Sequence, residues 1–93
     1  MYLFDAVRRM REMTKRGETF DVKFTHVNLS KNEGGHIGIE RECLVKPVKQ
    51  NRMKRQMIGL QRADGTLMNI YLLSLLEVRF TARGRYTKLT MRR

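Results

Sequence analysis

An Asp-Gly pair between two β-rich runs constrains the fold of this chain more than any other feature. Residues 57–62 and 66–71 are rich in strand-forming side chains and flank Asp64-Gly65. This arrangement predicts a tight β-hairpin, because glycine readily adopts the positive φ that such turns require. The alternation is lost over 72–76, where we expect a short helical turn. Extended chain over 77–80, a turn at 82–85 and a final strand over 86–91 complete the predicted order.

Two earlier runs alternate with a period of two, which is typical of strands with one buried face. In 19–29 the apolar members begin as Phe20, Val22 and Phe24. Their parity changes at Val27, so we expect a bulge or strong bend near 25–26. The second run extends from Ile37 to Val45. Its odd-numbered positions are apolar at Ile37, Ile39, Cys43 and Val45, and the charged Arg41 is the exception.

The remaining segments are turns and one helix. Residues 30–35 form a turn by composition, and Pro47 ends the second strand because it has no N–H to donate to a ladder. An amphipathic helix is predicted over 2–16, with Gly17 as its stop. Its apolar face consists of Leu3, Ala6, Val7, Met10 and Met13.

The predicted order is therefore helix, bent strand, strand, hairpin, helical turn and short strands. We expect a single mainly β (α+β) domain over 1–93, with the helix in 1–17 and a small barrel in 18–93. About five short antiparallel strands favour an SH3-like barrel capped by the N-terminal helix. An oligonucleotide-binding Greek-key barrel is the alternative.

Composition limits what such a domain can do. The chain has 93 residues, 41% of them hydrophobic, and a net charge of +11 from 20 basic and 9 acidic residues. It is long enough for one core and too short for two. The longest apolar stretch, 67–76, is well short of the roughly 20 residues that span a bilayer. Charges at Asp5, Arg8 and Arg9 interrupt any signal-peptide core, so we expect no membrane and a cytoplasmic or virion location.

The positive charge is concentrated in a basic loop, 46–55, and a basic tail, 79–93. Such runs neutralise phosphates and release counterions. We predict that nucleic acid or an acidic partner surface contacts Lys46, Lys49, Arg52, Lys54, Arg55, Arg83, Arg85, Lys88, Arg92 and Arg93. The alternative is that these charges only keep the protein soluble.

Other patterns argue against catalysis. The two histidines and the single cysteine match no compact zinc spacing, and Cys43 falls on the apolar parity. Glu40 and Glu42 share a wet strand face. Gly34-Gly35 lacks the lysine and hydroxyl of a phosphate-binding loop and leads into a strand. The sequence predicts no metal, no cofactor, no small-molecule substrate and no enzymatic activity.

Two aromatic side chains of the tail, Phe80 and Tyr86, lie beside cations in the sequence. Strand aromatics flanked by cations can stack nucleobases. The alternative is that Phe80 belongs to the core and Tyr86 is half-buried. No sequence-reading motif is present, so we expect nucleic-acid contacts to be directed to the backbone and to depend strongly on salt.

Five short features follow one another along residues 20–80. They are Phe20-Asp21-Val22-Lys23-Phe24, Gly34-Gly35, Ile58-Gly59-Leu60, Asp64-Gly65 and the closing 75–80. In these features the chain resembles small proteins encoded by bacteriophages and integrated mobile elements. The resemblance implies a phage setting, with a virion component as one role, and implies no mechanism.

Two functions are consistent with these features of the sequence. In the first, the protein is a structural or assembly component of a phage particle, packs against other protein subunits in an oligomer or larger assembly, and turns its basic face towards the genome. In the second, it is a stand-alone, sequence-nonspecific nucleic-acid-binding protein that uses the same cations to bind DNA or RNA phosphates.

Overall fold

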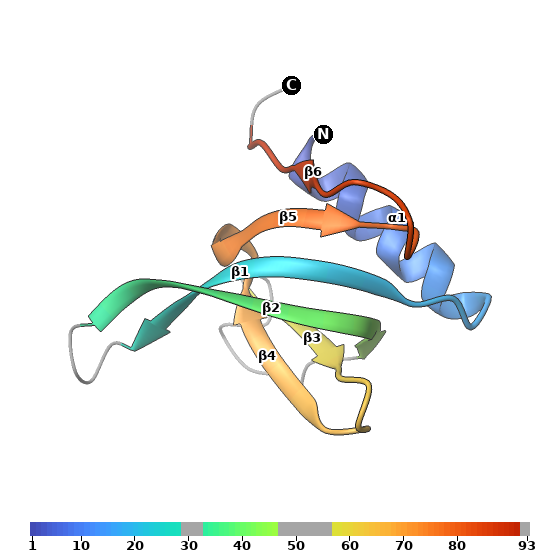
Figure 1. Cartoon of the computed structure of the whole chain (residues 1–93), viewed down its shortest axis with the longest axis horizontal. Helices are drawn as coiled ribbons and strands as arrows, with labels where there is room; N and C mark the ends of the chain where they lie inside the picture. The colour runs from blue at the N-terminus through green and yellow to red at the C-terminus, as the bar shows by residue number, and fades with distance from the viewer. Residues whose placement is uncertain (29–32, 47–56, 92–93) are drawn as a thin grey trace.

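A computed structural model describes residues 1–28, 33–46 and 57–91 of the chain. One helix packs against a six-stranded antiparallel sheet, whose strand order is β4-β3-β2-β1-β5-β6 (Figure 1). The elements in chain order are α1 (Leu3–Lys15), β1 (Phe20–Asn28), β2 (Glu33–Lys46), β3 (Met57–Gln61), β4 (Leu67–Tyr71), the single 3₁₀ turn η2 (Leu72–Ser74), β5 (Leu75–Arg79) and β6 (Thr87–Lys88).

The mainly β architecture with an N-terminal helix is confirmed, but the sheet is not closed into a barrel. β4 and β6 are the two edges of the described sheet, and no described pairing joins them. The physical reason lies in β5, which pairs with β1 on one side and with β6 on the other. Since β6 occupies the second edge of β5, β4 cannot pair with β5, and no described pairing joins β4 to the outer edge of β6.

The hairpin predicted from Asp64-Gly65 is present. Gly65 has a φ of 89°, and its N–H donates to the carbonyl of Arg62 at 2.9 Å. The Asp64 carboxylate accepts from the Thr66 N–H at 2.9 Å and from its hydroxyl at 2.6 Å, and these bonds lower the pKa of Asp64. The helical turn expected after the hairpin is η2, and β5 starts directly after it, earlier than predicted.

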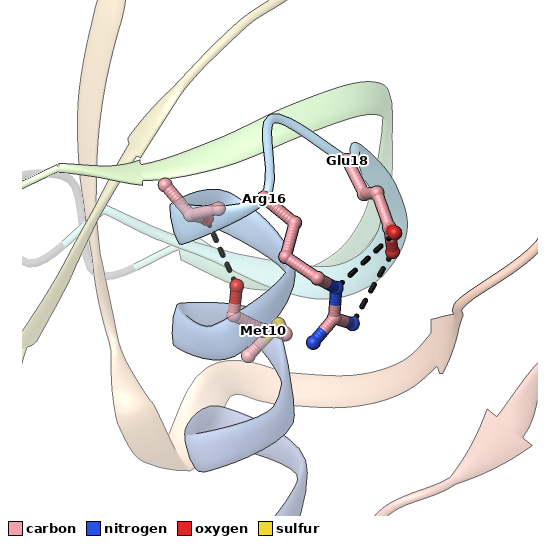
Figure 2. Close-up of polar contacts among 4 residues, drawn as sticks. Met10, Arg16 and Glu18 are labelled. Atoms are coloured by element: carbon pink, nitrogen blue, oxygen red, sulfur yellow. Dashed lines mark hydrogen bonds and ion pairs between the residues drawn. The ribbon is translucent and has the colours of Figure 1, made fainter.

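The buried face of α1 consists of the five apolar residues that its periodicity predicts. They join a core that β1 supplies with Phe20, Val22 and Phe24. Thr14 connects the helix to the sheet, because its hydroxyl donates to the Met10 carbonyl at 2.9 Å and accepts from the Val45 N–H at 3.0 Å. Figure 2 shows the Met10 carbonyl accepting this bond.

The helix ends where the sequence predicts. Gly17 has a φ of 74°, which glycine adopts without strain, and the Glu18 N–H returns to the Met13 carbonyl at 2.9 Å. At this end Arg16 and Glu18 form an exposed ion pair with an N–O distance of 3.1 Å (Figure 2). The ion pair lies on the surface and contributes little stability.

The pairing of β1 with β2 contains two irregularities. One falls between His26 and Val27, close to the bend predicted near 25–26. The other lies where Phe20 pairs with Cys43 but Val22 pairs with Glu40, so that β2 carries one extra residue. Glu42 has a φ of 55° in this bulge, and the bulge accounts for the misfit of Arg41 in the sequence pattern.

Because of this bulge, the apolar face predicted for β2 is wrong. Ile37 and Ile39 do not share a buried face with Cys43, because the extra residue shifts the parity of the strand. Ile37 is 63% exposed and Ile39 is 50% exposed, whereas Cys43 is fully buried. For the same reason the prediction that Glu40 and Glu42 share a solvent-exposed face is wrong, since Glu40 pairs with Val22 and lies on the same side of the sheet.

The two ends of β2 match the predictions in part. Gly34 and Gly35 were expected in a turn, but β2 already begins at Glu33. Both glycines and Glu33 therefore belong to the strand, and the remainder of the predicted turn, 30–32, lies outside the described residues. At the other end β2 extends to Lys46, and Pro47, which was expected to end the strand, lies outside the described residues.

The first and last described residues are joined by backbone hydrogen bonds. The Leu3 N–H donates to the Thr90 carbonyl and the Thr90 N–H to the Met1 carbonyl, both at 2.8 Å. The N-terminal amine donates to the Lys88 carbonyl at 3.0 Å, and Leu89 packs against the core. The predicted final strand is thus a two-residue β6 followed by a bridge to the start of α1.

We predict that deleting residues 87–93 lowers the free energy of unfolding by about 2–4 kcal/mol, because β6, the contact of Leu89 and the bonds to Leu3 are lost together. Urea unfolding followed by circular dichroism measures the change. The control is Met91→Ala, at a side chain that is 49% exposed, for which we expect a change within about 0.5 kcal/mol. Equal stability of the truncated and full chains would show that the joined ends do not hold the fold.

Candidate nucleic-acid interface

Ion pairs engage most of the described acidic side chains. The five pairs are Arg8–Asp5 at 3.7 Å, Arg16–Glu18 at 3.1 Å, Lys23–Glu77 at 3.8 Å, Arg62–Glu40 at 3.3 Å and Arg79–Asp21. A sixth acid, Asp64, is engaged by the bonds from Thr66. None of the five paired cations belongs to the predicted contact set. The paired acids therefore neutralise other parts of the protein, and none of them engages a described cation of the predicted contact set.

Four of the ten predicted contact residues are described. Lys46 is half-buried at the end of β2, and Arg83, Arg85 and Lys88 lie after β5 at the surface. Within 1–28, 33–46 and 57–91 none of these four side chains forms an ion pair. The other six lie outside the described residues: Lys49, Arg52, Lys54, Arg55, Arg92 and Arg93.

Sequence reasoning missed three further cations of the same kind. Arg11 and Lys15 lie on the exposed face of α1, and Arg41 is exposed in the bulge of β2. No acid of the described segments pairs with them. The signal for the helical pair was the net charge of +3 over 1–17, and the signal for Arg41 was its break in the alternation of β2.

Five of these cations gather at one end of the sheet. Asp21 pairs with Arg79 and Phe20 with Cys43, so β1 begins where β2 and β5 end. Figure 1 shows the end of α1, the end of β2 and the turn after β5 on the same side of the molecule. We call this region the basic end and define it by Lys15, Arg41, Lys46, Arg83 and Arg85.

A buried carboxylate holds this end together. Asp21 is 7% exposed, and its Oδ1 accepts from the Glu42 N–H at 2.9 Å. Its Oδ2 accepts from Arg79 Nε at 2.7 Å. One side chain of β1 therefore satisfies the β2 bulge and orients the last residue of β5, shortly before the turn that carries Arg83 and Arg85.

The tail aromatics are packed against cations. Arg9 Cζ lies 4.1 Å from the centroid of the Phe80 ring, which also packs against the core. Lys23 Nζ lies 4.3 Å and Arg79 Cζ 4.9 Å from the centroid of the Tyr86 ring. Both rings are half-buried, and this arrangement favours the interpretation in which they are structural.

No convergent catalytic arrangement is found among the described side chains. Burial raises the pKa of the Cys43 thiol to about 12, so the thiolate needed for nucleophilic chemistry is scarce near neutral pH. Glu40 pairs with Arg62 while Glu42 is exposed in the bulge, so they do not form an acid–base couple. In the three described segments, no group of three or more His, Cys, Asp or Glu residues is placed to hold a metal ion.

Comparison with known proteins adds no relative. No family model matches the chain, and neither a curated protein nor a solved structure is significantly similar to it. In the part of the chain that the structure describes, no helix has the length and apolarity needed to cross a membrane.

We predict that Asp21→Asn lowers the free energy of unfolding by about 2–4 kcal/mol, because the half-buried Arg79 guanidinium loses its charged partner. The matched control is Glu77→Gln, which breaks the looser Lys23 pair at 3.8 Å and should cost no more than about 1 kcal/mol. Both are measured by urea unfolding. A loss for Asp21→Asn no greater than that of the control would contradict the role assigned to Asp21.

Proposed function

We propose that this chain is a non-enzymatic, sequence-nonspecific nucleic-acid-binding protein of intracellular or virion location, which binds the phosphate backbone with its basic end. The observation that carries the proposal is the division of charge. Most of the described acids are engaged elsewhere, whereas the cations of the basic end have no acidic partner among the described residues. Uncompensated cations at one end of a small protein form a surface that attracts a polyanion.

The composition supports the same proposal. A net charge of +11 on 93 residues lies above the +2 to +8 or so that keeps a small domain soluble. The basic loop adds four cations from outside the described residues, and its sequence joins Lys46 to Met57. Each phosphate that a cation neutralises releases counterions, which makes binding favourable at low salt and sensitive to added salt.

The strand order supports an SH3-like relationship as part of this proposal. In such a fold a bent meander of four strands is followed by one helical turn and a fifth strand that returns to β1, and η2 and β5 follow the meander in this order. β6 then extends the sheet beyond β5 and keeps it open.

A second candidate function is favoured by exposed apolar side chains. Ile37 and Ile39 project from β2, and Leu67 is 67% exposed on the edge strand β4. A phage structural or assembly component would bury such residues against protein subunits. This function predicts a specific oligomer or complex as the main species, with charge in a secondary role.

We predict that the double variant Arg83→Glu/Arg85→Glu binds mixed-sequence DNA about tenfold to a hundredfold more weakly than the parent, because two contacts become repulsive. Fluorescence anisotropy at one fixed salt concentration measures the affinity. The matched control is Arg8→Glu/Arg11→Glu, which changes the net charge equally at exposed helix positions that do not belong to the basic end.

The control separates a localised interface from a general effect of charge. Equal losses in the two variants would contradict the assignment of the tail cations to the interface. The absence of DNA binding by the parent at physiological salt, together with a discrete oligomer in light scattering, would contradict the proposal and support the structural component.

A further inference from the structure

A cavity of about 220 Å³ lies between β1 and the free edge of β4. Four consecutive residues of β4, from Met68 to Tyr71, line it. Because side chains of a strand alternate between its faces, four in a row mean that the cavity follows the edge of β4. This edge has no partner among the described strands, so its backbone groups are available to a ligand.

We propose that this cavity takes one unstacked base of a single-stranded nucleic acid. The proposal rests on the proposed function and deepens it, since it names the form of nucleic acid that the protein prefers. Backbone contacts at the basic end supply affinity for any nucleic acid, and the cavity discriminates in favour of a strand whose bases are free.

The floor of the cavity suits a flat, weakly polar ring. Phe24 is 2% exposed and Ile70 is 7% exposed, and both line the cavity. Phe24 pairs with Gly38 across β1 and β2, so β2 places no side chain opposite the aromatic ring at this position. Burying a nucleobase against aromatic and aliphatic groups is the usual source of affinity for single strands.

Two hydroxyls in the lining can bind the edge of a base. Ser74 is 6% exposed at the end of η2, and Thr25 is half-buried on β1. Among the described residues neither hydroxyl has a hydrogen-bond partner. A hydroxyl both donates and accepts, so it can bind the polar edge of any base, which agrees with recognition that is independent of sequence.

The charge of the lining favours a nucleotide. Arg62 is the cation of the cavity, and its Nε lies 3.3 Å from Glu40 Oε1. No carboxylate belongs to the described lining itself. Arginine has five N–H donors, so one ion pair leaves donors with which Arg62 can bind the phosphate that follows the base.

The size of the cavity limits the ligand to one ring system. Pockets for drug-sized molecules measure about 300–1,000 Å³, and this cavity is smaller. A base within a duplex is stacked and paired and cannot enter it without leaving the helix. The geometry therefore predicts discrimination between single-stranded and double-stranded nucleic acid.

The test compares a labelled 12-nucleotide single strand of mixed sequence with the duplex of the same sequence at one salt concentration. We expect the parent to bind the single strand about 5- to 150-fold more tightly than the duplex. Thr25→Tyr fills the cavity and should remove this preference while duplex binding is unchanged. Ser74→Ala should weaken single-strand binding about 2- to 10-fold. Thr87→Tyr, at an exposed position of β6, is the matched control and should bind as the parent does.

The results distinguish a failure of the base site from a failure of the proposed function. If the parent prefers neither form, or if both cavity variants bind the single strand as the parent does, the cavity is not a base site and the proposed function stands. If the parent binds neither form, the proposed function fails and this inference fails with it. Should Thr25→Tyr not fold, as judged by circular dichroism, Ser74→Ala decides alone, since it removes one hydroxyl without adding volume.

Discussion

The ion pair between Asp21 and Arg79 links the three central strands of this small domain. Asp21 is buried in β1 and contacts both neighbouring strands, since it accepts from Arg79 of β5 and from the backbone of the β2 bulge. The bulge lies between Glu40 and Cys43 in the pairing of β2 with β1, and the residues of β2 that follow Cys43 pair with β3. A buried carboxylate needs a charged partner and hydrogen bonds, and this one has both.

The small number of acids also shapes the surface. Two carboxylates of the sheet, Asp21 and Glu40, are engaged by Arg79 in β5 and by Arg62 directly after β3. With 9 acids against 20 basic residues, the cations that remain are mainly those of the turns and the helix surface. They collect at the basic end because β1 begins there while α1, β2 and β5 end there. The electrostatic proposal therefore follows from the fold and does not depend on any catalytic group.

Local features of this chain were predictable from its sequence. The helix, its buried face and its stop at Gly17 follow from a 3.6-residue period and one glycine. The hairpin at Asp64-Gly65 follows from turn chemistry in the same way. In these segments the interactions that decide the structure lie a few residues apart, so a short window contains them.

Pairings between distant segments were not predictable in this way. The bulge at Glu42 shifts the parity of β2, so that Ile37 and Ile39 are exposed. The Glu42 N–H in this bulge donates to Asp21, which lies 21 positions earlier in the chain. The open sheet depends on β6, whose two residues are too short to give a pattern. The cavity beside β4 depends on several separate segments, and the polar side chains of Thr25, Arg62 and Ser74 distinguish its lining from ordinary core. Periodicity carries no information on any of these contacts.

The central claim is that uncompensated cations bind phosphate, and a salt series of DNA binding by the unaltered protein tests it most directly. If the five cations of the basic end each neutralise a phosphate, the logarithm of the association constant should fall linearly with the logarithm of salt concentration, with a slope of about −4 or steeper. A slope near zero, or no binding at low salt, would contradict the account.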